Sequence, residues 1–152
     1  MTAGTTAEYV FRSEWRLPAG PDEVYAALQD VERYPAWWPQ VIGVRRIDDL
    51  RGEMKVRSRL PYTLTVVLRR EVEDPVARVL RAVLDGDMTG MSQWTVSASD
   101  SGSLAVFDEA VDMRRRTIRT AGRLARPALV LNHSLMMRAG ERGLRSYLSA
   151  DR

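Results

Sequence analysis

Between Val41 and Met113 the chain reads as one strand after another, and this run constrains the fold more than any other feature of the sequence. Apolar and polar residues alternate in short segments, which is the pattern of half-buried strands. The connectors "DLRG", "EDP", "DGD" and "SDSGS" are short and rich in turn-forming residues. Consecutive strands with such tight connectors predict an antiparallel meander, because parallel neighbours need long crossovers. The predicted strands are Val41–Asp48, Glu53–Leu60, Tyr62–Val72, Arg78–Leu84, Met88–Ala98 and Leu104–Met113.

The segments before this run predict one further strand and two short helices. "EYVFRSEWRLP" alternates between apolar and charged residues, so we expect a half-buried strand. "PDEVYAALQD" reads as a helix, because Pro21 suits its first turn and the two acids that follow suit the helix dipole. In "VERYPAWWPQV" the prolines allow at most one more short helix. Trp37 and Trp38 lie there, in a segment too short to bury two indoles by itself.

The C-terminal segment, from about Thr120 to Ala150, has the periodicity of one long amphipathic helix. A helix of about 30 residues spans roughly 45 Å, which is long enough to cover one face of a curved sheet. Its polar face carries Arg138, Glu141, Arg142 and Arg145. Its apolar face carries Leu129, His133, Met136, Met137, Gly140, Leu144, Tyr147 and Leu148.

These elements predict an α+β fold: a seven-stranded curved antiparallel sheet wrapped around a long C-terminal helix, with two short helices between the first and second strands. Side chains or a cavity must fill the space between sheet and helix. Residues 1–7 are small and polar, and we expect them to be disordered. The length predicts that residues 8–152 form a single domain.

Three stretches carry a resemblance to a known family: "PDEVYAALQDVERYPAWWP", the strand pair "GMSQWTV…GSLAVFDEAV" and the helix "NHSLMMRAGERGL". They resemble the START-like superfamily, also called the helix-grip or SRPBCC group, and within it the bacterial polyketide cyclase/dehydrase-like branch. The resemblance implies a hydrophobic cavity between sheet and helix. It implies no particular reaction, since the superfamily includes carriers, sensors and cyclases.

The composition of the chain and the motifs that it lacks argue against several kinds of site and several classes of enzyme. The chain has no cysteine and one histidine, so we expect no disulfide, no metal site and no cofactor. Phosphate-binding, dinucleotide-binding, hydrolase-elbow and zinc-protease motifs are absent from the sequence. There is no secretory signal pattern and no apolar stretch long enough to span a membrane, so a cytoplasmic location is expected by elimination.

The basic residues are almost all arginine, and six of them lie between Met113 and Arg126 without an intervening acid. Two interpretations remain open for this segment: a solvated strand end leading into a helix, or contact with an anionic partner or membrane surface. The net charge is only +3, and the segment has no interleaved aromatic residues. We therefore expect no nucleic-acid binding.

His133 is the only histidine and lies on the apolar face of the predicted helix. It is either a core imidazole or a cavity group that orients a ligand carbonyl or acts as a general acid or base. The strand "LAVFDEAVDM" brings Asp108 inward in one register and Glu109 in the other. A buried carboxylate needs a partner, for which an arginine or His133 are candidates. The candidate catalytic residues are therefore His133, Asp108 and Glu109.

The predicted cavity walls give a set of candidate ligand contacts. Methionines suit a pocket for an oily ligand because they are adaptable. Gly140 and Gly143 cost helix stability, which is explained most simply by close approach of a strand or a ligand. The candidate ligand-binding residues are Trp38, Met54, Val56, Leu64, Trp94, Asn132, His133, Met136, Met137 and Gly140.

The sequence favours a module that binds a hydrophobic small molecule, either a lipid or an aromatic, polyketide-like compound. The alternative is a polyketide cyclase/aromatase or dehydratase that uses His133 and an inward carboxylate in the same cavity. A third hypothesis is an interaction protein that docks through residues 114–126. The sequence leaves open whether any reaction is catalysed, and it leaves the oligomeric state open, with a homodimer among the alternatives.

Overall fold

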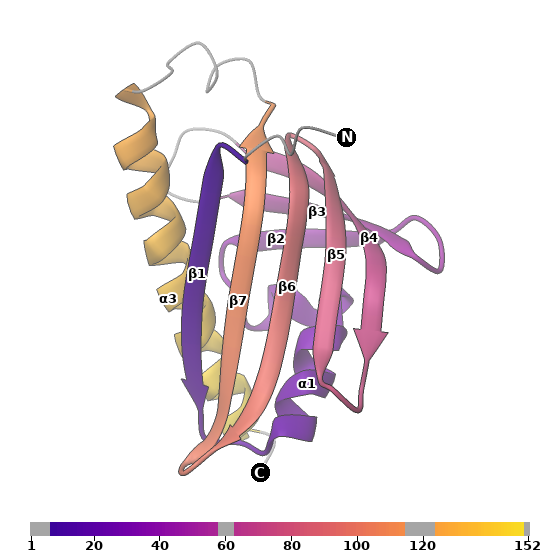
Figure 1. Cartoon of the computed structure of the whole chain (residues 1–152), viewed down its shortest axis with the longest axis vertical. Coiled ribbons are helices and arrows are strands. Elements are labelled where there is room, and N and C mark those ends of the chain that lie inside the picture. Colours follow the sequence, from indigo (N-terminus) through magenta and orange to yellow (C-terminus); the bar gives the residue numbers. More distant parts are fainter. Residues whose placement is uncertain (1–6, 58–62, 115–123, 151–152) are drawn as a thin grey trace, which may run out of the picture.

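The computed structural model describes residues 7–57, 63–114 and 124–150. Seven antiparallel strands form one sheet in the order β1-β7-β6-β5-β4-β3-β2. Its topology is a meander from β2 to β7, with β1 added beside β7 (Figure 1). The strands are β1 Tyr9–Leu17, β2 Val41–Arg46, β3 Arg51–Arg57, β4 Thr63–Asp74, β5 Val79–Gly86, β6 Met88–Ser99 and β7 Gly102–Met113.

All seven predicted strands are present, and their limits differ from the predicted ones by a few residues. Strand β4 ends two residues later than predicted, and a register shift between Arg70 and Val72 adds a residue and bends the strand. The predicted disorder of residues 1–7 falls almost wholly outside the described residues. So do the last three residues of the predicted strand Glu53–Leu60.

Two short helices, α1 Pro21–Gln29 and the 3-10 helix η1 Val31–Ala36, separate β1 from β2 as predicted. Pro21 opens α1, where its missing N–H group costs nothing, and Asp22 and Glu23 follow in the first turn. The C-terminal helix, α3, is Arg126–Ala150. It begins later than the predicted Thr120, so that Pro127 lies in its first turn, and residues 120–123 lie outside the described part of the chain.

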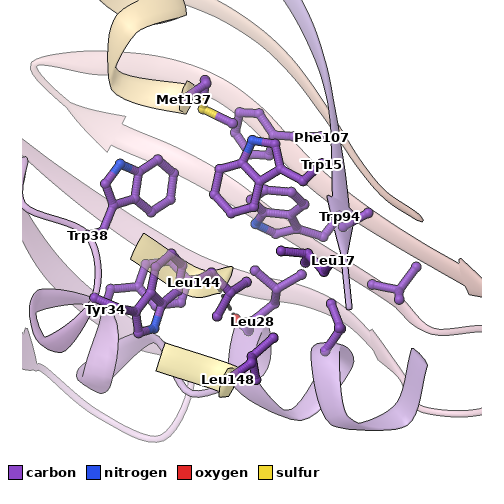
Figure 2. Packing of buried hydrophobic residues seen from close by; sticks show 14 of the residues in the cluster. Trp15, Leu17, Leu28, Tyr34, Trp38, Trp94, Phe107, Met137, Leu144 and Leu148 are labelled. Atoms are coloured by element: carbon purple, nitrogen blue, oxygen red, sulfur yellow. Dashed lines mark hydrogen bonds between the residues drawn. The ribbon is translucent and has the colours of Figure 1, made fainter. Parts of the chain in front are cut away.

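The sheet curves around α3 and the two short helices, which lie on its concave side (Figure 1). The core between them is built on aromatic rings. Trp15 of β1 contacts Trp38 and Trp94, with ring centroids 5.2 Å and 4.7 Å apart, and Trp94 contacts Phe107 at 4.7 Å (Figure 2). Leu144 of α3 is fully buried against this cluster. Trp37 and Trp38, which follow η1, are thus buried against residues of other elements, because their own segment is too short to bury them.

The second half of α3 is fastened to β1, which is an edge strand of the sheet. The main-chain N–H of Arg16 donates to Glu141 Oε2 at 2.9 Å, and the Arg145 guanidinium donates to the main-chain oxygen of Arg16 at 2.6 Å. Side chains of the helix therefore satisfy a main-chain donor and acceptor at the open edge. A long helix held by a curved antiparallel sheet is the predicted helix-grip fold.

Candidate functional site

A cavity of about 320 Å³ lies between the concave face of the sheet and the helices. Strands β3, β4 and β5 form one wall, because alternate residues of each strand point to the same face. Most side chains of this wall are aliphatic or thioether groups, and Arg51, Arg70 and Arg81 border it as well. The apolar members are Met54 and Val56 on β3, Leu64, Val66, Leu68 and Val72 on β4, and Leu80, Ala82 and Leu84 on β5.

Helix α3 and the aromatic cluster form the opposite wall. The first half of α3 contributes Leu129, Asn132, His133, Met136 and Met137. Trp38, Trp94 and Phe107 extend this wall with ring surface. The Trp38 indole donates a hydrogen bond to the main-chain oxygen of Met136 at 3.0 Å, which fixes the ring against the helix. The cavity is therefore enclosed mainly by apolar groups held on regular elements.

A polar pair lies inside this apolar surface. His133 Nε2 is 3.4 Å from Glu109 Oε1, and the two side chains are only 12% and 9% exposed. The contact is at ion-pair distance but lacks hydrogen-bond geometry, and Nε2 has no hydrogen-bond partner among the described residues. Ser92, directly opposite Glu109 in the β6–β7 register, also borders the cavity. The arrangement brings a base, a carboxyl group and a hydroxyl to one part of the cavity wall.

The orientation of His133 is set by aromatic stacking. Its imidazole lies 3.7 Å from the Phe11 ring, centroid to centroid, with the planes 10° apart. Phe107 lies on the β7 side with its centroid 6.4 Å away. Stacking restricts the rotation of the imidazole and removes water from its faces, so that ring nitrogens remain the routes to a ligand.

Charged side chains gather at the opposite end of the cavity, where they neutralise one another. Arg46 bonds Glu32 at 3.0 Å, and Arg51 bonds Asp48 at 2.8 Å. All four side chains are about half exposed or more. They form a solvated rim around an apolar interior.

Tyr34 closes the cavity beside η1. Its hydroxyl donates to the main-chain oxygen of Leu28 at 2.6 Å, and the side chain is buried. Burial raises the pKa of this phenol well above its ordinary value of 10.0, because the phenolate would lose its hydration. Tyr34 is therefore a neutral hydrogen-bond donor throughout the physiological pH range.

The structure separates the two carboxylates that the sequence left as alternatives. Glu109 faces the cavity, since it shares the inward face of β7 with Phe107. Asp108 does not line the cavity: it points to the outer face of the sheet and bonds Arg12 of β1 at 3.0 Å. The proposal of Asp108 as a catalytic residue is therefore dropped. The strand pairing decides this, because both faces of β7 alternate equally well in the sequence.

Gly140 is the one predicted ligand contact that does not border the cavity. A Cβ atom there would lie 2.6 Å from Trp38 Cε2 and 2.7 Å from Trp15 Cη2. At Gly143 a Cβ atom would lie 1.7 Å from the main-chain oxygen of Trp37. The predicted close approach to both glycines exists, but indole rings and the η1 segment make it rather than a ligand. The other nine predicted contacts line the cavity, and their role in binding stays a prediction.

Several wall residues were absent from the sequence-based set. Phe11 and Tyr9 lie on the inward face of β1, and their alternation with charged residues was a usable signal. The inward residues of β4 and β5 follow the same rule. Phe107 and Ser92 were not predicted because their strands alternate without marking which face is inside.

No group of three or more histidine, cysteine, aspartate or glutamate side chains within 7–57, 63–114 and 124–150 is arranged to hold a metal ion. No helix in the same ranges is long and apolar enough to cross a membrane.

Solved structures with the same fold are numerous, and their sequences are distant. A protein from Thermus thermophilus aligns with 95% of this chain and 100% of its own, at 16% identity and a TM-score of 0.76. A START superfamily protein from Mycobacterium smegmatis aligns over 94% and 99%, at 13% identity and a TM-score of 0.73. The Zhui aromatase/cyclase from Streptomyces sp. R1128 aligns over 91% and 92%, at 18% identity and a TM-score of 0.70. Identities this low establish the fold alone.

No curated protein matches the sequence. A family model does match, over residues 17–130, from the end of β1 to the first turns of α3. Its description is "Polyketide cyclase / dehydrase and lipid transport". The match covers the strands and helices that enclose the cavity, and the fold agrees with the solved START-like structures. The chain belongs to the polyketide cyclase/dehydrase and lipid transport family.

Proposed function

We propose that this protein binds a hydrophobic small molecule, a lipid or an aromatic, polyketide-like compound, in the cavity between the sheet and α3. The observation that carries the proposal is the cavity itself, with its volume of about 320 Å³ and its nearly continuous apolar wall. This volume falls at the lower end of the ~300–1,000 Å³ typical of small-molecule sites. The family description supports the same class of ligand.

The His133–Glu109 pair would orient such a ligand in the cavity. An oily ligand with one oxygen-bearing end gains most if that end meets His133 and Glu109 and its body contacts the aliphatic wall, because an unpartnered buried polar group is costly. His133 Nε2, which lacks a hydrogen-bond partner among the described residues, is the group that a ligand oxygen would satisfy.

Native mass spectrometry of the protein purified from its source tests the proposal directly, since a co-purifying molecule identifies the ligand class. A binding titration of delipidated protein with a fatty acid and with an aromatic polyketide-like probe completes the test. Trp38 and Trp94 line the cavity, so bound ligand changes their fluorescence.

A matched pair of variants shows whether binding occurs in the cavity. Ala82 on β5 lines the cavity, whereas its neighbour Val83 does not. We expect Ala82→Phe to weaken binding about ten-fold or more, equivalent to about 1.4 kcal/mol, and Val83→Phe to leave it unchanged. Equal affinities in the two variants, with both proteins folded, would contradict the cavity as the binding site.

A second function is favoured by one specific observation, the His133–Glu109 contact of 3.4 Å inside the cavity. A histidine beside a carboxyl group can move a proton to and from a bound substrate, as aldol cyclisation and dehydration of a poly-β-carbonyl chain require. The reaction would be seen as conversion of a poly-β-carbonyl thioester analogue. If it occurs, His133→Gln and Glu109→Gln abolish turnover and retain binding. Turnover that persists in both variants excludes the pair as the acid and base.

A further inference from the structure

The first half of α3 exposes large apolar side chains on the side away from the sheet. Leu131 and Leu135 lie one turn apart on this side and are 60% and 37% exposed. Leu124, two residues before the helix, is 90% exposed. In Figure 1 no other described element lies on this outer side of α3. We call Leu124, Leu131 and Leu135 the outer apolar stripe.

Arginines border the outer apolar stripe, and acids do not. Arg138 and Arg142 follow Leu131 and Leu135 on the same side of the helix, at spacings of three and four residues. Both are exposed, and neither forms an ion pair within the described part of the chain. Arg126, at the start of the helix, is not one of them, because its guanidinium donates to the main-chain oxygen of Glu8 and lies over the Tyr9 ring on the β1 side.

The charge of the surrounding chain has the same sign. Glu141 is the one acid in the sequence of α3, and its carboxylate is bound to the Arg16 N–H and lies 3.9 Å from Arg145. The sequence that connects Arg114 to Leu124 holds four more arginines and no acid.

We propose that the outer apolar stripe docks on the surface of an anionic lipid bilayer, with Leu131 and Leu135 entering the interface and Arg138 and Arg142 contacting lipid headgroups. Exposed leucines on a helix face bordered by arginines are the arrangement of helices that lie in a membrane interface. Each arginine near an anionic surface adds roughly five-fold to the partition coefficient, from about 1 kcal/mol per charge.

A second copy of the chain fits this face less well than a bilayer does. In a two-fold dimer the same patch meets itself, so that Arg138 and Arg142 of both copies would be brought together without acids to pair them. An anionic bilayer supplies charge of the opposite sign and an apolar layer in one surface. Charge complementarity therefore selects the bilayer as the occupant.

The outer apolar stripe and part of the cavity wall lie on opposite sides of the same turns of α3. Asn132, His133 and Met136, which belong to the same turns as Leu131 and Leu135, line the cavity on the inner side of the helix. A bilayer on the outer side would lie one helix diameter, about 10 Å, from the cavity. This short distance is what the exchange of a hydrophobic ligand with a membrane requires, although docking does not itself depend on a ligand in the cavity.

Vesicle co-sedimentation of the purified chain tests the proposal without any knowledge of the ligand. The vesicles are phosphatidylcholine alone or phosphatidylcholine with phosphatidylglycerol, at low and at high salt. The variants are Leu131→Ser/Leu135→Ser and Arg138→Gln/Arg142→Gln. The controls are Val76→Ser, at an 89% exposed site in the β4–β5 connection, and Arg69→Gln, at an exposed site on β4. Because all six positions are exposed, the variants should fold, which thermal unfolding verifies.

We expect the wild-type protein to bind the anionic vesicles and to be released by salt. The leucine variant should lose about ten-fold or more, and the arginine variant roughly 25-fold, from two charges at about 1 kcal/mol each. The controls should bind as the wild type does. Absence of binding to anionic vesicles at low salt overturns the proposal, as does binding that the leucine variant leaves unchanged. A wild-type dimer that the leucine variant converts to monomers would assign the stripe to a second copy instead.

Discussion

The Trp38 indole and the main-chain oxygen of Met136 are joined by a hydrogen bond of 3.0 Å, although 98 residues separate them in the sequence. The bond connects the segment after η1 to the middle of α3, where both line the cavity. This polar contact thus holds the segment after η1 against α3, in the cavity wall that they form together. Mutation of Trp38 measures how much this hydrogen bond contributes to stability.

Trp38→Phe removes the donor and keeps most of the ring surface. We expect the free energy of unfolding to fall by about 1–3 kcal/mol, since a part-buried carbonyl loses a partner and a smaller ring packs less well. Urea denaturation measures the change. Trp94→Phe is a comparison for the loss of ring surface, because Trp94 also lines the cavity and its side chain interacts with Tyr34 rather than with Met136. We expect Trp38→Phe to lower ligand affinity by more than its loss of folding stability accounts for.

Gly140→Ala places a methyl group against two indole rings, 2.6 Å from Trp38 and 2.7 Å from Trp15. Alanine favours helix by about 1 kcal/mol, but overpacking costs about 1–3 kcal/mol, so we expect a net loss of stability. Gly143→Ala should cost more, because the obstacle is the main-chain oxygen of Trp37, which cannot rotate away. If either variant has a higher free energy of unfolding than the wild type, the neighbouring η1 segment and its tryptophans move aside at little energetic cost. Ser146→Ala, at an exposed site on the same helix, is the control for helix propensity.

Glu141→Ala removes the acceptor of the Arg16 N–H at the edge of the sheet. We expect a loss of about 1–2 kcal/mol, the usual range for a hydrogen bond to a charged group that is partly solvated. Hydrogen exchange at the Arg16 amide gives a local reading of the same effect. Exchange should accelerate at this amide and stay unchanged in the centre of β6. Unchanged exchange at Arg16 would mean that water replaces the carboxylate without cost.

The His133–Glu109 pair should show strong non-additivity. His133→Phe leaves the Glu109 carboxyl buried without its partner, which we expect to cost about 2 kcal/mol. Replacing both residues, as in His133→Phe/Glu109→Leu, should restore stability to within about 1 kcal/mol of the wild type, because no polar group is left unpaired. A double-mutant cycle from urea denaturation gives the coupling. If the losses of unfolding free energy in the two single variants add up to the loss in the double variant, the two side chains do not interact and are solvated independently.

Alkaline pH should destabilise the protein through Tyr34. Burial raises the pKa of this phenol in the folded state, so the folded protein retains a proton that the unfolded chain releases above pH about 10. Stability is therefore complete below pH about 10 and falls with increasing pH above it, at up to about 1.4 kcal/mol per pH unit. Tyr34→Phe should be less stable at neutral pH, through loss of its bond to Leu28, and should show a shallower alkaline slope. Unfolding free energies at several pH values from 8 to 11 measure both effects.

The sequence predicted the fold because its signals are local. Alternation within each strand, turn residues between strands and the 3.6-residue period of α3 are visible in windows of a few residues. The inward face of β1 was predictable for the same reason, since charged residues alternate with Phe11 and Trp15. Both faces of β7 alternate, so its pairing with β1, where Glu109 lies opposite Phe11, is what places Glu109 on the inward face.

The contacts that define the site depend on tertiary structure. Glu109 and His133 lie on different elements, and the sequence named both without showing that they meet at 3.4 Å. The glycines of α3 signal close approach, but the sequence does not distinguish a ligand from the rings of Trp38 and Trp15. Spacing along the chain carries no information on either point, because loops and sheet curvature set the distances.

The attachment of α3 to the edge strand β1 has a consequence for aggregation. The first half of the helix is held by the bonds of Arg126 to Glu8 and of Trp38 to Met136. The second half is held by the bonds from Glu141 and Arg145 to Arg16, which cover the β1 edge. Release of the second half would leave that edge free to pair with a strand of another molecule. Loss of the Glu141 and Arg145 contacts should therefore promote self-association more than any widening of the cavity does.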